Sequence, residues 1–292
     1  MRYRFIEDHR KELPVTAMCR VLRVGRSGYY DWRAREGAGP SGRQERRQRL
    51  TEEIRAVHGR SRGLYGSPRV HAELKAKGVP ACENTVAKYM KRAGISSRAR
   101  KRFVVRTTDS SHGHPVAPNT LGRRFDAAAW ATPDSAWCCD VTCVWTDEGW
   151  LYLAAVIDLC SRRIVGWAMA EHMKAELCLD ALGMALERRR PAAGLLHHSD
   201  RGVQYACDAY QSLLGREGIA CSMSRTGDCY DNAAIESFFS TLKRELVYQE
   251  HYWTREQAKR SLFEYVEVFY NRQRRHSSLG YRSPVEFEAS LN

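Results

Sequence analysis

The sequence of 292 residues lacks long apolar runs. A transmembrane helix needs about 20 predominantly apolar residues, and no stretch approaches that length, so no membrane partner is expected. The first residues, MRYRFIEDHRKEL, also lack the apolar core of a secretory signal peptide. These two absences favour a cytoplasmic protein.

Paired-cysteine motifs are missing as well, although the chain contains 10 cysteines. None forms a CxxC pair or the spacing of a paired zinc knuckle. Cys138, Cys139 and Cys143 cluster, and His197 with His198 could join them, but adjacent residues of a strand point to opposite faces. A zinc site is therefore disfavoured, and reduced, partly buried cysteines are expected.

Acidic residues are scarce in the first third of the chain. Residues 1–110 contain 27 Lys and Arg against 11 Asp and Glu, whereas residues 111–292 contain 20 against 23. The net charge of +13 is therefore +16 from the first part and −3 from the second. Such a confined excess favours a nucleic-acid-binding arm attached to a near-neutral domain.

Short helical patterns joined by a turn occur twice in this basic part. In the first segment, placed at residues 1–36, helices are predicted over 15–22 and 27–35, with a turn at Val24 and Gly25. This arrangement is helix-turn-helix-like, although an ordinary helical hairpin would give the same pattern. Residues 36–42, EGAGPSG, have the composition of a linker.

The second segment, placed at residues 44–95, begins with a basic helix over 44–58. Ser67 as N-cap and Pro68 as the first helical residue predict the start of a second helix, which ends at Gly78. A third helix over 83–93 would turn its apolar residues inward.

The outward side of this third helix is predicted to read a DNA groove. A solvated basic face on a small helical bundle is the alternative. The candidate DNA-binding residues of the segment are Arg69, Asn84, Thr85, Lys88, Lys91 and Arg92. Residues 96–125 add a basic run and are predicted to be a linker that follows DNA phosphates.

From residue 136 the pattern changes to apolar runs of strand type. Runs at 136–146, 150–159 and 161–170 with short turns predict an antiparallel meander. A helix over 174–190, a strand at 194–198, a helix over 206–217, a strand at 219–223 and a further helix follow. This order predicts an α/β fold with a ribonuclease-H-like core, a mixed five-stranded sheet and flanking helices, preceded by small all-α helix-turn-helix segments. The core is placed at 126–250, and a C-terminal helix with a basic tail at 251–292.

The last helix of the core begins at Asp231 or Asn232, either of which can accept backbone N–H bonds as the N-cap. Glu236 lies near the helix start, and Lys243 lies on the same side seven residues further on. Taken alone, both would be solvated surface charges. The apolar stripe beside them, expected to be buried, consists of Ile235, Phe238, Phe239, Leu242 and Leu246.

Three carboxylates fall where the predicted fold would bring them together. Asp140 lies inside an apolar strand, where a charge is costly unless it is paired or metal-bound. Asp200 follows the fourth strand, which should neighbour the first, and Glu236 begins the helix that packs across them. Such acids can hold Mg²⁺, with Mn²⁺ as a substitute. Two ions about 4 Å apart would hold the attacking and leaving oxygens of a phosphodiester in line.

These residues resemble the insertion-sequence transposases that have a retroviral-integrase-like catalytic core, specifically the second-reading-frame protein of the IS-three type. The motifs are WCCDVT at 137–142, HSDRGVQY at 198–205, DNAAIESFFSTLKRE at 231–245 and YNRQRRHSSLGYRSP at 270–284. Asp200 and Glu236 have 35 residues between them, which is the family spacing. Cys139 and Cys143 flank the first acid where the family more often has Thr and an aromatic residue.

The resemblance implies catalytic and metal-binding roles for Asp140, Asp200 and Glu236, and a DNA-contacting role for Lys243. It implies DNA strand cleavage and 3′-hydroxyl strand transfer on element ends and target DNA, by a homo-oligomer. Family members usually act as a frameshift fusion with an upstream protein that carries a leucine zipper, and no sustained heptad is visible in this chain.

Two other functions stay open at this point: a non-catalytic DNA-binding regulator of transposition, and a ribonuclease-H-like nuclease that never joins its products. The basic run that contains Arg274 and Arg275 suggests phosphate contacts, with a capping tail as the alternative.

Overall fold

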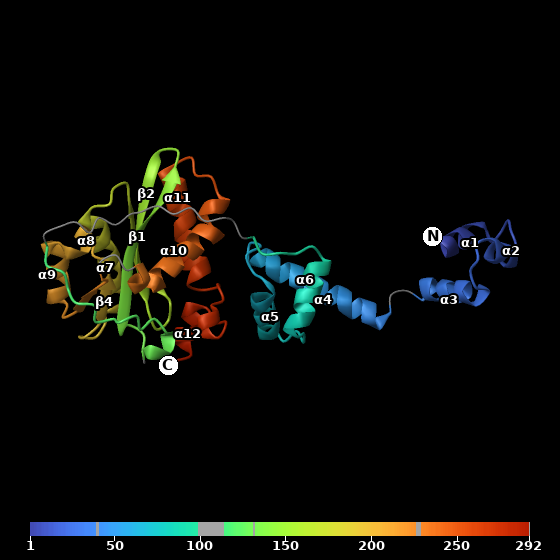
Figure 1. Cartoon of the computed structure of the whole chain (residues 1–292), viewed down its shortest axis with the longest axis horizontal. Coiled ribbons are helices and arrows are strands. Elements are labelled where there is room, and N and C mark those ends of the chain that lie inside the picture. Colours follow the sequence, from blue (N-terminus) through green and yellow to red (C-terminus); the bar gives the residue numbers. More distant parts are fainter. Residues whose placement is uncertain (39–40, 99–113, 131, 226–228, 292) are drawn as a thin grey trace. The chain divides into compact units, whose positions relative to one another are not determined.

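The computed structural model describes residues 1–38, 41–98, 114–130, 132–225 and 229–291 (Figure 1). The described residues form two compact units, Met1–Ser96 and Ser97–Asn292. Four cations of the expected linker lie outside the described residues: Arg100, Lys101, Arg102 and Arg106.

The first unit opens with three short helices. They are α1 (Arg2–His9), α2 (Val15–Val21) and α3 (Arg26–Gly37). Ile6, Met18, Cys19 and Tyr29 form their buried core. The sequence predicted α2 and α3 but not α1, whose Glu7 accepts a hydrogen bond of 2.6 Å from the Tyr29 hydroxyl. Because α3 continues to Gly37, the start of the expected 36–42 linker is helical.

Three further helices complete the first unit. They are α4 (Gly42–Arg60), α5 (Ser67–Ala76) and α6 (Glu83–Arg92). Gly66, and not Ser67, is the N-cap of α5, so Pro68 is the second helical residue. Gly78 and Gly94 follow α5 and α6 with φ of +74° and +67°, a left-handed conformation that ends a helix at little cost in glycine.

The second unit is built on a five-stranded mixed sheet, as predicted. Its strands are β1 (Ala136–Thr146), β2 (Gly149–Asp158), β3 (Ile164–Ala170), β4 (Leu196–Ser199) and β5 (Ala220–Met223). Their order is β3-β2-β1-β4-β5. The β1–β2 and β2–β3 pairs are antiparallel, whereas β1–β4 and β4–β5 are parallel. The first and fourth strands are therefore neighbours, as the sequence predicted.

Helices cover both faces of this sheet (Figure 1). The helices of the core are α7 (Ala175–Arg189), α8 (Val203–Ala206), α9 (Asp208–Arg216), α10 (Ala233–Glu245) and α11 (Arg255–Phe263). Cys139 and Val141 of β1 pack with Leu177 and Leu182 of α7 in one buried cluster. Because side chains alternate along a strand, Asp140 faces the other side, where α10 packs against β1 and β2.

Close packing of α7 on β3 depends on Gly166. A Cβ atom at this position would lie 2.2 Å from the Ala181 carbonyl oxygen and 2.7 Å from the Ala185 Cβ. The helix thus meets the sheet through small residues. The residue spacing of this helix predicts a buried stripe of Leu177, Leu179, Leu182, Met184 and Leu186. This prediction is only partly right, since Leu179, Met184 and Leu186 are half-buried.

Two other helices differ from the prediction. The expected helix over 206–217 is broken at Cys207, whose extended ψ of 152° separates α8 from α9. Helix α11 continues as a π-helical segment, Glu264–Tyr270, before the short α12 (Pro284–Ala289). The residue spacing of this C-terminal helix predicts an apolar face of Leu262, Tyr265, Val266 and Phe269, and all four are buried.

Residues 116–125, hereafter the leading segment, pack on the second unit although they were expected to be linker. Leu121 is fully buried. The backbone N–H groups of Thr120 and Leu121 donate to the Ser222 Oγ of β5 at 3.0 and 3.2 Å. The core therefore begins before residue 126.

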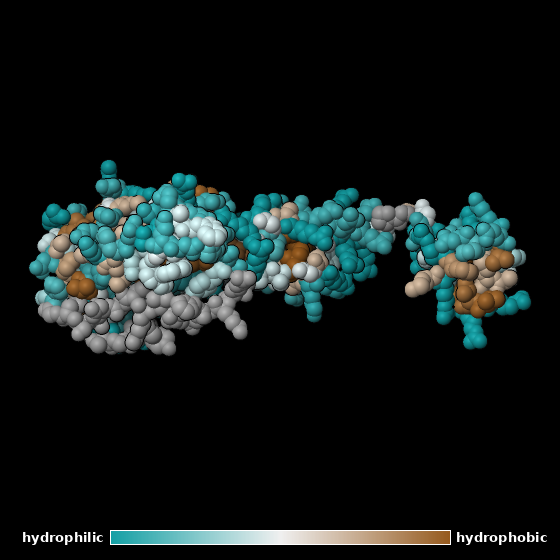
Figure 2. Space-filling model, turned by 90° about the horizontal axis from the view of Figure 1, so that it is seen from above, coloured by the Kyte–Doolittle hydropathy of each residue, from teal (hydrophilic) through white to brown (hydrophobic). Residues whose placement is uncertain are grey.

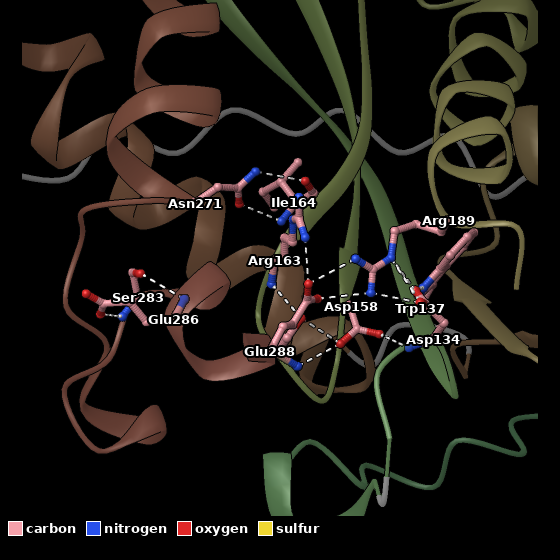
Figure 3. Close-up of polar contacts among 11 residues, drawn as sticks. Asp134, Trp137, Asp158, Arg163, Ile164, Arg189, Asn271, Ser283, Glu286 and Glu288 are labelled. Carbon is pink, nitrogen blue, oxygen red and sulfur yellow. Dashed lines mark hydrogen bonds and ion pairs between the residues drawn. The ribbon is translucent and has the colours of Figure 1, made fainter. Parts of the chain in front are cut away.

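The C-terminal segment is fastened to the sheet by polar contacts (Figure 3). The Asn271 side chain exchanges two hydrogen bonds with the backbone of Ile164, of 2.9 and 3.0 Å. Glu288 of α12 pairs with Arg163 at 2.6 Å and with Arg189 at 3.0 Å. This segment therefore caps the edge strand β3.

On the face shown in Figure 2, hydrophilic residues cover most of both units, and apolar residues appear as separate patches. Among the helices that the structure describes, none is long and apolar enough to span a membrane.

Candidate active site

The parallel pairing of β1 with β4 places Asp140 and Asp200 at equivalent positions. Cys138 pairs with His198, and each acid lies two residues beyond that pair. Asp200 directly follows the end of β4, and its charge acts on Asp140, so the two carboxylates lie in one site. Both side chains are half-buried.

Each of these carboxylates is held by a local backbone bond. The N–H of Val141 donates to Asp140 Oδ1 at 2.7 Å, and the N–H of Gly202 donates to Asp200 Oδ1 at 2.8 Å. A Cβ atom on Gly202 would lie 3.0 Å from that Asp200 oxygen and 2.8 Å from Gln204 Oε1. Glycine thus allows the turn after β4 to close around the carboxylate.

The third acid, Glu236, lies in the first turn of α10 with an exposed side chain. The apolar stripe of this helix is buried as predicted, so Glu236 lies at its edge. Asn232 is the N-cap residue, but neither it nor Asp231 caps the helix through its side chain. The Asn232 Nδ2 instead donates to the carbonyl oxygen of Cys139 at 3.3 Å, which ties the helix start to the residue before Asp140.

The electrostatic environment of Asp140 links the three acids. Burial raises the pKa of Asp140 well above its usual range, and the charges of Asp200 and Glu236 raise this pKa further. Burial lowers the pKa of Lys243, while Cys143 and Asp140 act in the opposite direction. Like charges in one site are unfavourable together, so this site favours a bound cation.

Within the described part of the chain, no group of three or more His, Cys, Asp or Glu side chains forms a ready-made metal site. The donor chemistry nevertheless fits Mg²⁺, because this ion takes one or two carboxylates and completes its shell with water and substrate phosphates. The half-buried Asp140 and Asp200 form the fixed part of the site, and the exposed Glu236 would have to turn towards them.

The buried hydrogen-bonded group of His197, Cys139 and Tyr210 was not expected from the sequence, which grouped Cys139 and His197 only as disfavoured zinc ligands. The His197 Nε2 lies 2.9 Å from Cys139 Sγ and 2.9 Å from the Tyr210 hydroxyl. Burial lowers the pKa of His197 to about 3, so this histidine is neutral. The signal that could have found it is the adjacency of His197 and His198 on a buried strand.

Four of the six candidate DNA-binding residues of the first unit lie on the exposed side of α6. Asn84, Lys88, Lys91 and Arg92 are exposed, while Val86 and Met90 are buried. Thr85 is half-buried, with Oγ1 3.0 Å from Cys82 Sγ. In α5, the guanidinium of Arg69 lies 5.7 Å from the ring centroid of Tyr65.

The two C-terminal candidates have protein partners. Arg274 is buried and forms two bonds of 2.8 Å with Glu245. Arg275 donates to the carbonyl oxygen of Tyr281 at 2.9 Å and lies 3.3 Å from Glu286.

Family comparisons match both units. A family model described as an integrase core domain matches residues 131–229, and a second model with the same description matches residues 217–284. A model described as an HTH-like domain matches residues 45–103.

Similar proteins span nearly the whole chain. It is 46% identical over 288 residues to the transposase InsF for insertion sequence IS3A of Escherichia coli (strain K12), covering 99% of this chain and 98% of the relative. It is 44% identical over 270 residues to an uncharacterized 31 kDa protein of insertion element IS600 from Shigella sonnei, covering 92% and 97%.

Solved structures with detectable likeness are more distant. One is a simian T-cell lymphotropic virus intasome in complex with a PP2A regulatory subunit, with 12% identity, a TM-score of 0.47, and coverage of 80% of this chain and 74% of that chain. Another is the HTLV-2 integrase catalytic core domain in complex with magnesium, with 13% identity, a TM-score of 0.42, and coverage of 54% and 97%.

Proposed function

The chain belongs to the family of IS3 insertion-sequence transposases, and from this premise we propose that Asp140, Asp200 and Glu236 are the metal-binding catalytic residues of its integrase core. The observation that carries this assignment is the parallel pairing of β1 with β4, which puts Asp140 and Asp200 each two residues beyond the Cys138–His198 pair. The charges of Asp200 and Glu236 both act on Asp140, which supports a single site.

The proposed chemistry is metal-dependent strand cleavage followed by strand transfer. Two Mg²⁺ or Mn²⁺ ions, when bound, supply activation of water or a 3′-hydroxyl and stabilisation of the leaving oxygen. Asp140 and Asp200 provide oxygen ligands from a rigid sheet, and Glu236 provides one from the start of α10. Lys243 contacts a substrate phosphate from the same side of that helix.

DNA binding is proposed for α6 and Arg69 of the first unit, and separately for Arg275 of the second unit. The retained residues are Arg69, Asn84, Thr85, Lys88, Lys91, Arg92 and Arg275. We leave out Arg274, because a buried guanidinium with two bonds to Glu245 has its hydrogen-bonding capacity directed into the protein. The proposed substrates are the ends of the insertion sequence and the target DNA, bound by an oligomer of this chain.

The proposed domains are a helical segment at 1–37, the HTH-like domain at 44–95, the catalytic core and the C-terminal cap at 251–292. We propose that the core begins within the leading segment, because Leu121 is buried there.

Strand cutting and joining, measured with DNA that carries the element ends, tests this function. In Mg²⁺ the expected products are a nicked end and a joined molecule, and neither forms when EDTA removes the metal. A nuclease would cut without joining, and a regulator would bind without cutting. Running the assay on this chain alone and on a version extended by the upstream frame decides whether the fusion is needed.

A further inference from the structure

Asp231 is a buried carboxylate that the proposed chemistry does not use. It lies five residues before Glu236 and is 0% exposed. Arg225 donates to it three times, from its backbone N–H at 2.9 Å, from Nε at 2.9 Å and from NH2 at 3.0 Å. Since Arg225 lies two residues beyond the end of β5, this set of bonds joins α10 to the sheet.

The same carboxylate also holds the leading segment. Arg123 Nε donates to Asp231 Oδ1 at 2.7 Å, and Asn119 Nδ2 donates to Oδ2 at 2.8 Å. Hydrogen bonding from Arg225 is the main reason that the pKa of Asp231 lies well below its usual range, so the carboxylate stays ionised. One charged group therefore joins the exit of β5 and the start of α10 to the leading segment, which is more than 100 residues away in the sequence.

Asn232, the residue after Asp231, also anchors the start of α10. Asn232 donates to the Cys139 carbonyl oxygen, next to Asp140. Because α10 has no side-chain N-cap bond, these two adjacent anchors supply the polar contacts that fix its first turn, in addition to the burial of Ile235. Asp231 ties the turn to the leading segment and to the exit of β5, and Asn232 ties it to β1.

We propose that Asp231 is the positioning residue that sets where Glu236 lies relative to Asp140 and Asp200. This inference rests on the proposed function, because it assumes that Glu236 works with the other two acids. Some residues orient a metal ligand without binding the metal themselves. Replacing such a residue typically lowers metal affinity or activity by about 10- to 100-fold. Loss of the Asp231 charge would release the first turn of α10 without touching a ligand.

A purely structural role for Asp231 is the alternative, and Glu288 provides a matched control. Its carboxylate is largely buried, with a side chain 12% exposed, and it pairs with two arginines, Arg163 and Arg189 (Figure 3). It holds α12 and contacts none of the three acids through these bonds. Glu288→Gln removes the same charge from a comparable network.

The test compares Asp231→Asn with Glu288→Gln in the full chain. Hydrogen exchange of residues 233–237 measures the order of the first turn of α10. Strand-cutting kinetics give kcat, KM for DNA and the Mg²⁺ concentration for half-maximal rate. For Asp231→Asn we expect faster exchange, a kcat lower by about 10- to 100-fold, a higher Mg²⁺ requirement and an unchanged KM. Glu288→Gln should leave all four unchanged in the folded protein.

A folded Asp231→Asn protein with the exchange, kcat and Mg²⁺ requirement of the unmodified chain would overturn the proposal. So would equal losses in both variants. If Asp231→Asn does not fold, Asn119→Ala removes one of the bonds to Asp231, together with the bond that Asn119 Oδ1 accepts from the Gly122 N–H. This variant should shift the same readouts in the same direction by a smaller factor, whereas no shift counts against the role. Glu236→Gln tests the catalytic assignment separately. If this variant cuts DNA at the rate of the unmodified chain, the proposed function is wrong, whatever the hydrogen-exchange data show.

Discussion

Arg274 and Glu245 form a two-bond ion pair that fastens the C-terminal segment to the last residue of α10. Their side chains are only 7% and 13% exposed. The Tyr265 hydroxyl donates a third bond of 2.8 Å to the same carboxylate. The basic run at 272–275 thus contains one arginine used for folding beside an exposed one, Arg272.

Replacing Arg274 by Ala should therefore lower stability. Removal of one partner from a buried ion pair leaves an uncompensated charge and costs about 3–5 kcal/mol. Denaturant unfolding should show this loss in the free energy of unfolding, while DNA affinity per folded molecule stays unchanged. Arg272→Ala is the matched control and should leave stability unchanged. Equal stability of the two variants would contradict the assignment.

Cys82 should be the fastest-reacting cysteine among those described. It is exposed at the N-cap of α6, and the hydrogen bond with the Thr85 side chain lowers its pKa, which raises the thiolate fraction. The Thr85→Val variant should be alkylated more slowly at Cys82 at neutral pH, as measured by peptide mass spectrometry.

The same labelling experiment tests the orientation of α6. If this helix enters a DNA groove, DNA with the element ends should protect Cys82 from alkylation. Full labelling of Cys82 in a saturated complex would show that another surface carries the DNA.

Stability should fall in acid partly because of His197. Burial lowers its pKa to about 3, so between about pH 6.5 and pH 3 the unfolded chain binds a proton that the folded chain does not. The free energy of unfolding then falls by about 1.4 kcal/mol for each pH unit in this window. His198, whose pKa burial lowers to about 4, acts in the same direction.

The test measures the free energy of unfolding at several pH values between about 6.5 and 4, for the unmodified chain and for His197→Gln. The Gln side chain cannot take up this proton. The variant should show a smaller slope of stability against pH. Identical slopes would mean that His197 is not the source of this pH dependence.

The sequence predicted the features that depend on local pattern. The strand β1, its acid at Asp140 and the buried stripe of α10 follow from residue periodicity, and the neighbouring positions of β1 and β4 follow from the order of elements. The large side chains of α7 misled the prediction, because the surface that meets the sheet is decided by Gly166 on another element.

The partners of Asp231 could not be predicted in the same way. A carboxylate just before a helix is normally an N-cap. Its partners Asn119 and Arg123 lie 112 and 108 residues away in the sequence, so no local pattern indicates them. The leading segment was assigned to a linker for the same reason, since only the fold brings Leu121 into the core.

The most direct test of the three-acid site is the strand-cutting rate of Glu236→Gln in Mg²⁺, with DNA binding measured in parallel. Loss of a metal ligand removes several kcal/mol of transition-state stabilisation, so cutting should fall by about 1,000-fold or more. DNA affinity should be retained. Glu187→Gln, at an exposed position on α7, should cut normally. Cutting by Glu236→Gln at the rate of the unmodified chain would contradict the account.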